Sequence, residues 1–197
     1  EYVFEATALI KANIEVPLIG FTGSPWTLFV YLFYGKSPKN RDELNSYLEL
    51  HSQNAHSYLE QLTDITKNYV QAQIEAGADC IQIFDSWGGL LDEKYEELSL
   101  TYINQIASSI EKNIPVILYT RGKLIDDIIN LTSIKCFNLD TSDSIDNYID
   151  KDITIQGNFD PKNFHADNEV LQEMAQTVWT KYKDKQNYVF NLGSGLT

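Results

Sequence analysis

The fold is decided by stretches such as DCIQIFDSWGG at residues 79–89, where an apolar run ends abruptly in polar residues and glycines. A short run rich in Ile and Phe, bounded by turn-forming residues, is typical of a parallel strand that is covered on both faces. This stretch predicts a strand over 79–84. Five further stretches have the same form and predict strands over 17–21, 115–119, 134–139, 153–156 and 188–191.

Helical patterns separate these strands, because apolar residues recur there every three or four positions. A long segment between the first two strands adds two or three helices, broken at 36–40. Strands that alternate with helices indicate an α/β protein, either an open doubly wound sheet or a closed (β/α) barrel. The predicted apolar faces are Leu59, Leu62, Ile65 and Tyr69; Tyr95, Leu98, Tyr102, Ile106 and Ile110; and Leu171, Met174, Ala175, Val178 and Tyr182.

The residues that follow the strands favour the barrel. Small, polar or glycine residues come after all six strands. A (β/α) barrel builds its site from the carboxyl ends of all its strands, whereas an open sheet concentrates its site at one switch point. We therefore expect a TIM-type (β/α)8 barrel, incomplete here, with about six of its eight strands.

The chain is then expected to be one domain that lacks two N-terminal strands and the last helix. Its first residues have no initiator Met and resemble the middle of a helix, which indicates a cut end. Such a chain would expose two sheet edges and the inside of a barrel, which favours aggregation.

Composition narrows the class of partner. A formal net charge of −13 argues against nucleic acid or an anionic membrane as a partner, since both need basic patches. No apolar run is long enough to span a bilayer. Cys80 and Cys136 each lie in a predicted strand, which suits a reducing cytoplasm better than a disulfide scaffold. Arg41 and Arg121 are the only arginines.

Four segments, in order along the chain, resemble the uroporphyrinogen decarboxylase family. PLIGFTGSPWTL at 17–28, with Tyr31 beyond it, resembles the family's third-strand signature, and QIFDSWGG at 82–89 resembles the next strand end. IQGNFDP at 155–161 is similar to the family's Gln-Gly-Asn-Leu-Asp-Pro, and FNLGSG at 190–195 to its Asn-Leu-Gly-His-Gly. Each match alone is weak, but four in the family's order and spacing are specific.

The resemblance implies a cytoplasmic carboxy-lyase that is generally a homodimer and uses no cofactor and no metal. The family removes the four acetate carboxyls of uroporphyrinogen III to give coproporphyrinogen III, in haem and porphyrin biosynthesis. The enzyme must bind carboxylates, supply a proton and stabilise a cationic macrocycle. The family's two N-terminal arginines and its aspartate of the second strand end have no counterpart in this chain, so the chain alone is expected to be inactive.

By the same resemblance, Phe21 and Phe84 match residues that line the macrocycle pocket, and Tyr31 and Ser86 match polar residues near its carboxylate arms. A phenol and a hydroxyl can each hydrogen-bond a carboxylate without adding charge. Ser194 stands at the position of the family's histidine, where serine can hydrogen-bond but cannot titrate near neutral pH. We take Tyr31, Ser86 and Ser194 as candidate catalytic residues and all five as substrate-binding.

Several other polar residues have two interpretations. Asp85 could be an acid or could cap the next helix. Asp160, before Pro161, is better explained as a cap. Arg121 could meet a substrate carboxylate or pair with a neighbouring aspartate. A separate set, His51, His56 and His165, lies away from cysteines and paired carboxylates, so the sequence predicts no metal site.

Two alternative functions follow. The first is a catalytically degenerate paralogue that binds tetrapyrroles, suggested by Ser194. The second, less favoured, is a cobalamin-linked methyltransferase of the same superfamily. Those enzymes hold zinc with a His–Cys pair and a later cysteine, and this sequence has no His-x-Cys.

Overall fold

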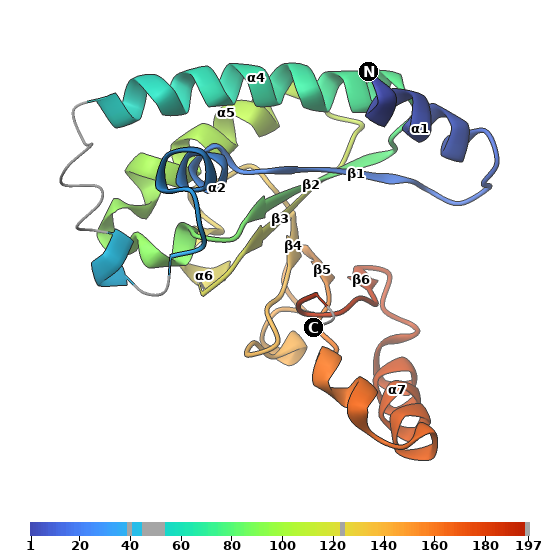
Figure 1. Ribbon diagram of the computed structural model, residues 1–197. Coiled ribbons are helices and arrows are strands. Elements are labelled where there is room, and N and C mark those ends of the chain that lie inside the picture. The colour runs from blue at the N-terminus through green and yellow to red at the C-terminus, as the bar shows by residue number, and fades with distance from the viewer. Residues whose placement is uncertain (39–40, 45–53, 123–124, 196–197) are drawn as a thin grey trace. The chain divides into compact units, whose positions relative to one another are not determined.

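The computed structural model describes residues 1–38, 41–44, 54–122 and 125–195, which form two compact units, Glu1–Ile134 and Lys135–Thr197. Six strands alternate with helices along the chain (Figure 1), which confirms the predicted α/β class.

The first unit carries β1 (Ile19–Gly23), β2 (Cys80–Asp85) and β3 (Val116–Thr120), all parallel. The register places Phe21 opposite Gln82, and Phe84 opposite both Gly23 and Tyr119. Each strand begins one or two residues later than the sequence predicts and ends one or two residues later. Apolar runs mark burial rather than hydrogen bonding, and Pro17 has no N–H to donate to a ladder.

Helices cover one face of these strands, with α4 running along β1 and β2 and α5 beside it (Figure 1). Gly20 permits this close approach, because a Cβ on it would lie 2.9 Å from Gln73 Oε1. The helices of the first unit include α1 (Tyr2–Lys11), α2 (Pro25–Phe29), the π-helical η1 (Val30–Tyr34), α4 (Ala55–Glu75), η3 (Gly88–Leu90), η4 (Asp92–Lys94), η5 (Glu96–Leu100), α5 (Thr101–Ser109) and α6 (Ile125–Ile128).

The core lies between the strands and this helical layer. The predicted apolar face at 95–110 is confirmed, since all five of its residues are buried. The predicted face of α4 is partly wrong, because Ile65 is 62% exposed and the buried side instead includes Thr63, Thr66 and Val70. Thr63 can be buried because its hydroxyl donates to Leu59 O within the helix (2.7 Å).

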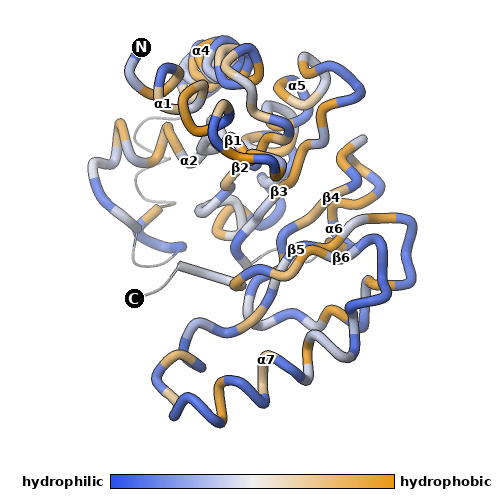
Figure 2. Tube along the Cα trace, turned by 90° about the vertical axis from the view of Figure 1, so that its right-hand side faces the viewer, coloured by the Kyte–Doolittle hydropathy of each residue, from blue (hydrophilic) through white to orange (hydrophobic). Residues whose placement is uncertain are grey.

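The second unit carries three short parallel strands, β4 (Cys136–Asn138), β5 (Thr154–Gln156) and β6 (Tyr188–Val189). Its helices are η6 (Ile145–Asn147), η7 (Pro161–His165) and α7 (Asn168–Tyr182). The helix predicted near 171–182 is confirmed, and its hydropathy alternates along the tube in Figure 2. Of its predicted apolar face, only Tyr182 is buried.

Strand order favours the barrel. In each unit, strands that follow one another in the chain are neighbours in the sheet, β1–β2–β3 in the first and β4–β5–β6 in the second. An open doubly wound sheet reverses its order at a switch point, and neither unit contains such a reversal. Among the described residues, none of the helices is both long and apolar enough to cross a membrane.

Candidate active site

An aromatic strip lies on the strand face that the helices leave uncovered. Phe21 contacts Phe84 edge-on with ring centres 6.1 Å apart, and Phe84 contacts Tyr119 at 5.9 Å. Phe21 is 61% exposed. In a (β/α) barrel the uncovered strand face is the barrel interior, so the exposed Phe21 and half-buried Phe84 present apolar rings there, with Tyr119 buried beside them.

The backbone of Phe21 is fixed by a side chain of α4. Phe21 N–H donates to Gln73 Oε1 (3.0 Å), and Gln73 Nε2 donates to Phe21 O (3.1 Å). Gln73 is buried, and both ends of its amide are used. The helix thereby sets the position of the first ring of the aromatic strip.

Asp85 organises the segment that follows β1. The Ser24 hydroxyl donates to Asp85 Oδ1 (2.7 Å), and Ser24 Oγ accepts from Thr27 N–H at the start of α2 (3.0 Å). Ser24 N–H in turn donates to Phe84 O (2.9 Å). The carboxylate therefore supports the N-cap of the helix that leads to Tyr31.

The capping interpretation of Asp85 is thus favoured over its use as an acid facing the barrel interior. Asp85 is fully buried on the helical side of β2, because side chains alternate along a strand and Phe84 takes the open face. Burial raises the pKa of Asp85 to about 6, against the lowering effects of the Ser24, Ser99 and Tyr95 hydroxyls. Its Oδ2 atom completes no hydrogen bond of normal geometry.

Two glycines allow the turn after β2 to pack closely. A Cβ on Gly88 would lie 1.9 Å from Asp85 Oδ2, and one on Gly89 would lie 2.1 Å from Arg121 O. Only glycine fits either place. The Gly88-Gly89 pair therefore joins the end of β2 to the turn after β3, a role that the sequence analysis did not assign.

Trp87 brings together residues from three strand ends. Its ring contacts Tyr31 edge-on (6.1 Å), and the Arg121 guanidinium lies over it (5.4 Å). Its carbonyl accepts from Trp26 Nε1 (3.1 Å). Sequence analysis missed Trp87, although a large aromatic side chain directly after Ser86 at a strand end was an available signal.

Ser86 lies between Asp85 and Trp87 and is half-buried. Within the described part of the chain, its hydroxyl has no hydrogen-bond partner. The predicted residues of the first unit form two groups near the carboxyl ends of the strands. Phe21 and Phe84 touch directly, while Tyr31 and Ser86 are connected through Trp87.

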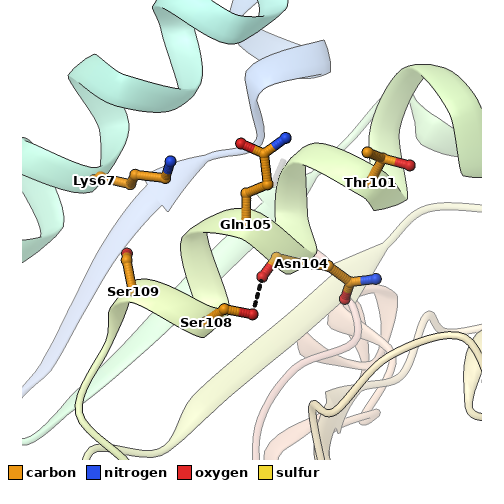
Figure 3. A pocket seen from close by; sticks show the side chains of 6 residues that line it. All are labelled: Lys67, Thr101, Asn104, Gln105, Ser108 and Ser109. Carbon is orange, nitrogen blue, oxygen red and sulfur yellow. Dashed lines mark hydrogen bonds between the residues drawn. The ribbon is translucent and has the colours of Figure 1, made fainter.

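A separate hollow of about 450 Å³ lies between α4 and α5, in the helical layer away from these strand ends (Figure 3). Polar side chains line it, and the Ser108 hydroxyl donates to Asn104 O there (2.7 Å). It contains none of the predicted site residues, so we do not place the active site in it. The lining residues are Lys67, Thr101, Asn104, Gln105, Ser108 and Ser109.

In the second unit, amides organise the strand ends. Gln156 Nε2 donates to Asn138 Oδ1 (2.7 Å), and Asn158 Nδ2 donates to the carbonyls of Asp140 and Asp143 (2.7 and 2.6 Å). Burial raises the pKa of Asp143, and the nearby Asp140 charge adds to this. These bonds fix the turns after β4 and β5.

Ser194 follows β6 in the same unit and is half-buried, with no hydrogen-bond partner among the described residues. The preceding Gly193 packs against Thr141, since a Cβ there would lie 2.7 Å from both Thr141 N and Cγ2. Thr141 thus directly faces the loop that carries Ser194.

Asp160 is a cap, as predicted, and accepts from Lys162 N–H (2.9 Å) at the start of η7. His56 forms hydrogen bonds with Tyr102 Oη (2.8 Å) and Glu97 Oε1 (2.9 Å). His165 ends η7, and His51 lies outside the described residues. Within the described ranges, no group of three or more His, Cys, Asp or Glu residues could hold a metal ion.

Comparison with known proteins agrees with this architecture. The sequence matches the uroporphyrinogen decarboxylase (URO-D) family over residues 1–197. A protein named uroporphyrinogen decarboxylase from Christiangramia forsetii is 37% identical, with 99% of this chain and 59% of that protein aligned. One of the same name from Francisella tularensis subsp. novicida is 35% identical, over 100% and 60%.

The structure resembles that of a methyltransferase from Methanosarcina mazei, with a TM-score of 0.76 and 17% identity, covering 99% of this chain and 59% of the other. At that identity, the likeness shows the fold alone. Together with the strand order, it defines an α/β protein of the (β/α) barrel type with its candidate site at the strand ends.

The chain belongs to the uroporphyrinogen decarboxylase family. It spans about three fifths of the length of the curated relatives that it matches.

Proposed function

We propose that this chain is the larger part of a uroporphyrinogen decarboxylase, a cytoplasmic homodimer that converts uroporphyrinogen III to coproporphyrinogen III without a cofactor. The observation that carries the proposal is the family match over all 197 residues. The aromatic strip supports it, because a tetrapyrrole needs an apolar surface and the exposed Phe21 and half-buried Phe84, backed by the buried Tyr119, offer one.

The chemistry uses the substrate as its own electron sink. A proton adds to a pyrrole carbon and makes the ring cationic. The bond between the acetate methylene and its carboxylate then breaks, its electron pair neutralises the ring, and CO₂ leaves. A proton adds to the methylene to give a methyl group, and the first proton is released. Repeating this at four arms gives the product.

In this proposal the chain's residues bind and orient the substrate. Phe21 and Phe84 contact the macrocycle. The Tyr31 phenol and the Ser86 hydroxyl hydrogen-bond carboxylate arms, and both lie beside Trp87 or next to it in sequence. Asp85 is not given the role of stabilising the cation, because it is buried on the helical side of β2.

A non-catalytic tetrapyrrole-binding protein is the second candidate. Ser194 favours it, because a hydroxyl at the family's histidine position cannot titrate near neutral pH as imidazole does. Both candidates bind the same class of ligand and differ in whether CO₂ is released.

The deciding experiment measures coproporphyrinogen formed from uroporphyrinogen III by the full-length protein that contains this chain, beside its Ser194→His variant. We expect the unchanged protein to be active and the variant to differ from it by less than about tenfold, since serine retains a hydrogen-bonding group.

Product from the histidine variant alone would indicate a paralogue silenced at this position. No product from either protein, with uroporphyrinogen still bound, would overturn the decarboxylase proposal in favour of the binding protein.

A further inference from the structure

The cluster of Arg121, Trp87 and Tyr31 joins one cation to two aromatic rings at the strand ends of the first unit. We propose that Arg121 is the binding residue for one carboxylate arm of the tetrapyrrole. This inference rests on the proposed function and adds to it a residue that defines how the substrate is oriented.

Backbone contacts fix the position of Arg121. Its N–H donates to Asp85 O (3.3 Å), and its carbonyl faces Gly89 so closely that no side chain could stand there. Trp87, on which the guanidinium rests, is itself held by the bond from Trp26 Nε1 to its carbonyl. The cation is therefore presented from a defined place and is not on a free loop.

The charge of Arg121 is available to a ligand. The other arginine, Arg41, pairs with Asp92. Arg121 makes no ion pair within the described residues, although the chain carries a net charge of −13. The Arg121 guanidinium lies over the Trp87 ring (5.4 Å), and its N–H donors can match a carboxylate bidentately.

The surroundings fit an apolar macrocycle with acidic arms. Trp87 follows Ser86, whose hydroxyl has no partner in the described part of the chain, and Phe84 before it belongs to the aromatic strip. An apolar surface bordered by a cation and a hydroxyl complements an apolar macrocycle with a carboxylate at its rim.

The test compares Arg121→Gln, Arg121→Lys and, as a matched control for loss of one positive charge, Arg41→Gln, all in the full-length protein. We expect Arg121→Gln to raise the KM for uroporphyrinogen about tenfold with kcat changed less, because the contact is made equally in the ground and transition states. Arg121→Lys keeps the charge without the fork and should fall in between. Arg41→Gln should leave KM unchanged, and unfolding curves verify that each variant is folded.

A KM for Arg121→Gln equal to that of Arg41→Gln, in an active wild-type protein, would overturn this inference and leave the proposed function intact. If the wild-type protein forms no coproporphyrinogen, the proposed function fails. The role of Arg121 is then tested by equilibrium binding of coproporphyrin to the wild-type protein and to Arg121→Gln. About tenfold weaker binding by Arg121→Gln supports the carboxylate site. Equal binding by the two proteins, or none by wild type, overturns it.

Discussion

At the scale of the residue, Asp85 is a carboxyl group that the fold encloses completely, and this has a consequence for pH. Burial raises its pKa from an ordinary 3.8 to about 6. Between these values the folded protein retains a proton that the unfolded chain has released, so the free energy of unfolding falls as pH rises from 3.8 to about 6. Asp85→Asn, which cannot ionise, should lose this fall, on the order of 3 kcal/mol. Urea unfolding at a series of pH values measures it.

Asp79→Asn supplies a control of opposite sign. Lys11 donates to Asp79 (2.7 Å) and lowers the pKa of that carboxyl. Its stabilising contribution is therefore present above its ordinary pKa and is lost only as pH falls below it. Identical pH slopes for wild type and Asp85→Asn would contradict the assignment of Asp85.

At the scale of the element, the close contact between the turns after β2 and β3 depends on Gly89. In Gly89→Ala the new Cβ would meet the Arg121 carbonyl at 2.1 Å, and backbone cannot yield as a flexible side chain can. We expect a loss of about 1–3 kcal/mol in unfolding free energy. Because Arg121 must move, tetrapyrrole binding should weaken as well. Urea unfolding and a binding titration measure the two effects.

Gly195→Ala is the matched comparison for stability, since among the described residues no heavy atom other than those of its chain neighbours lies within 4 Å of a Cβ at that position. It should change the unfolding free energy by less than about 0.5 kcal/mol. Equal stability of the two alanine variants would mean that the two turns can separate without cost.

The helices and strands also show how much of the fold could be predicted from the sequence. Apolar runs located all six strands, and the periodicity at 95–110 located a buried helix face. The α4 face was misassigned at Ile65 because periodicity counts apolar residues, whereas Thr63 and Gln73 are buried with their polar atoms satisfied. The period of two in a strand could have placed Asp85 opposite Phe84. The steric roles of Gly88 and Gly89 could not be predicted, since they depend on contacts between separate turns.

At the scale of the whole molecule, the chain aligns with about three fifths of its relatives, and the open face of the first unit exposes Ile19 and Phe21. We expect the isolated 197-residue chain to self-associate and bind a hydrophobic dye, because the apolar side chains of β1 are exposed. We also expect it to form no coproporphyrinogen. Light scattering, dye fluorescence and product analysis, with the full-length protein as control, measure this. A monodisperse, active chain would contradict it.

Through the paired hydrogen bonds between Gln73 and Phe21, α4 protects the outer edge of β1. The Phe21 N–H points away from β2, where its hydrogen would otherwise exchange freely with solvent. Instead, this N–H donates to Gln73 Oε1, and Phe21 O accepts from Gln73 Nε2. Exchange at Phe21 then requires α4 to lift from β1. Local opening of a helix and fraying of a strand become a single event, so the first ring of the aromatic strip loses its place only when α4 does.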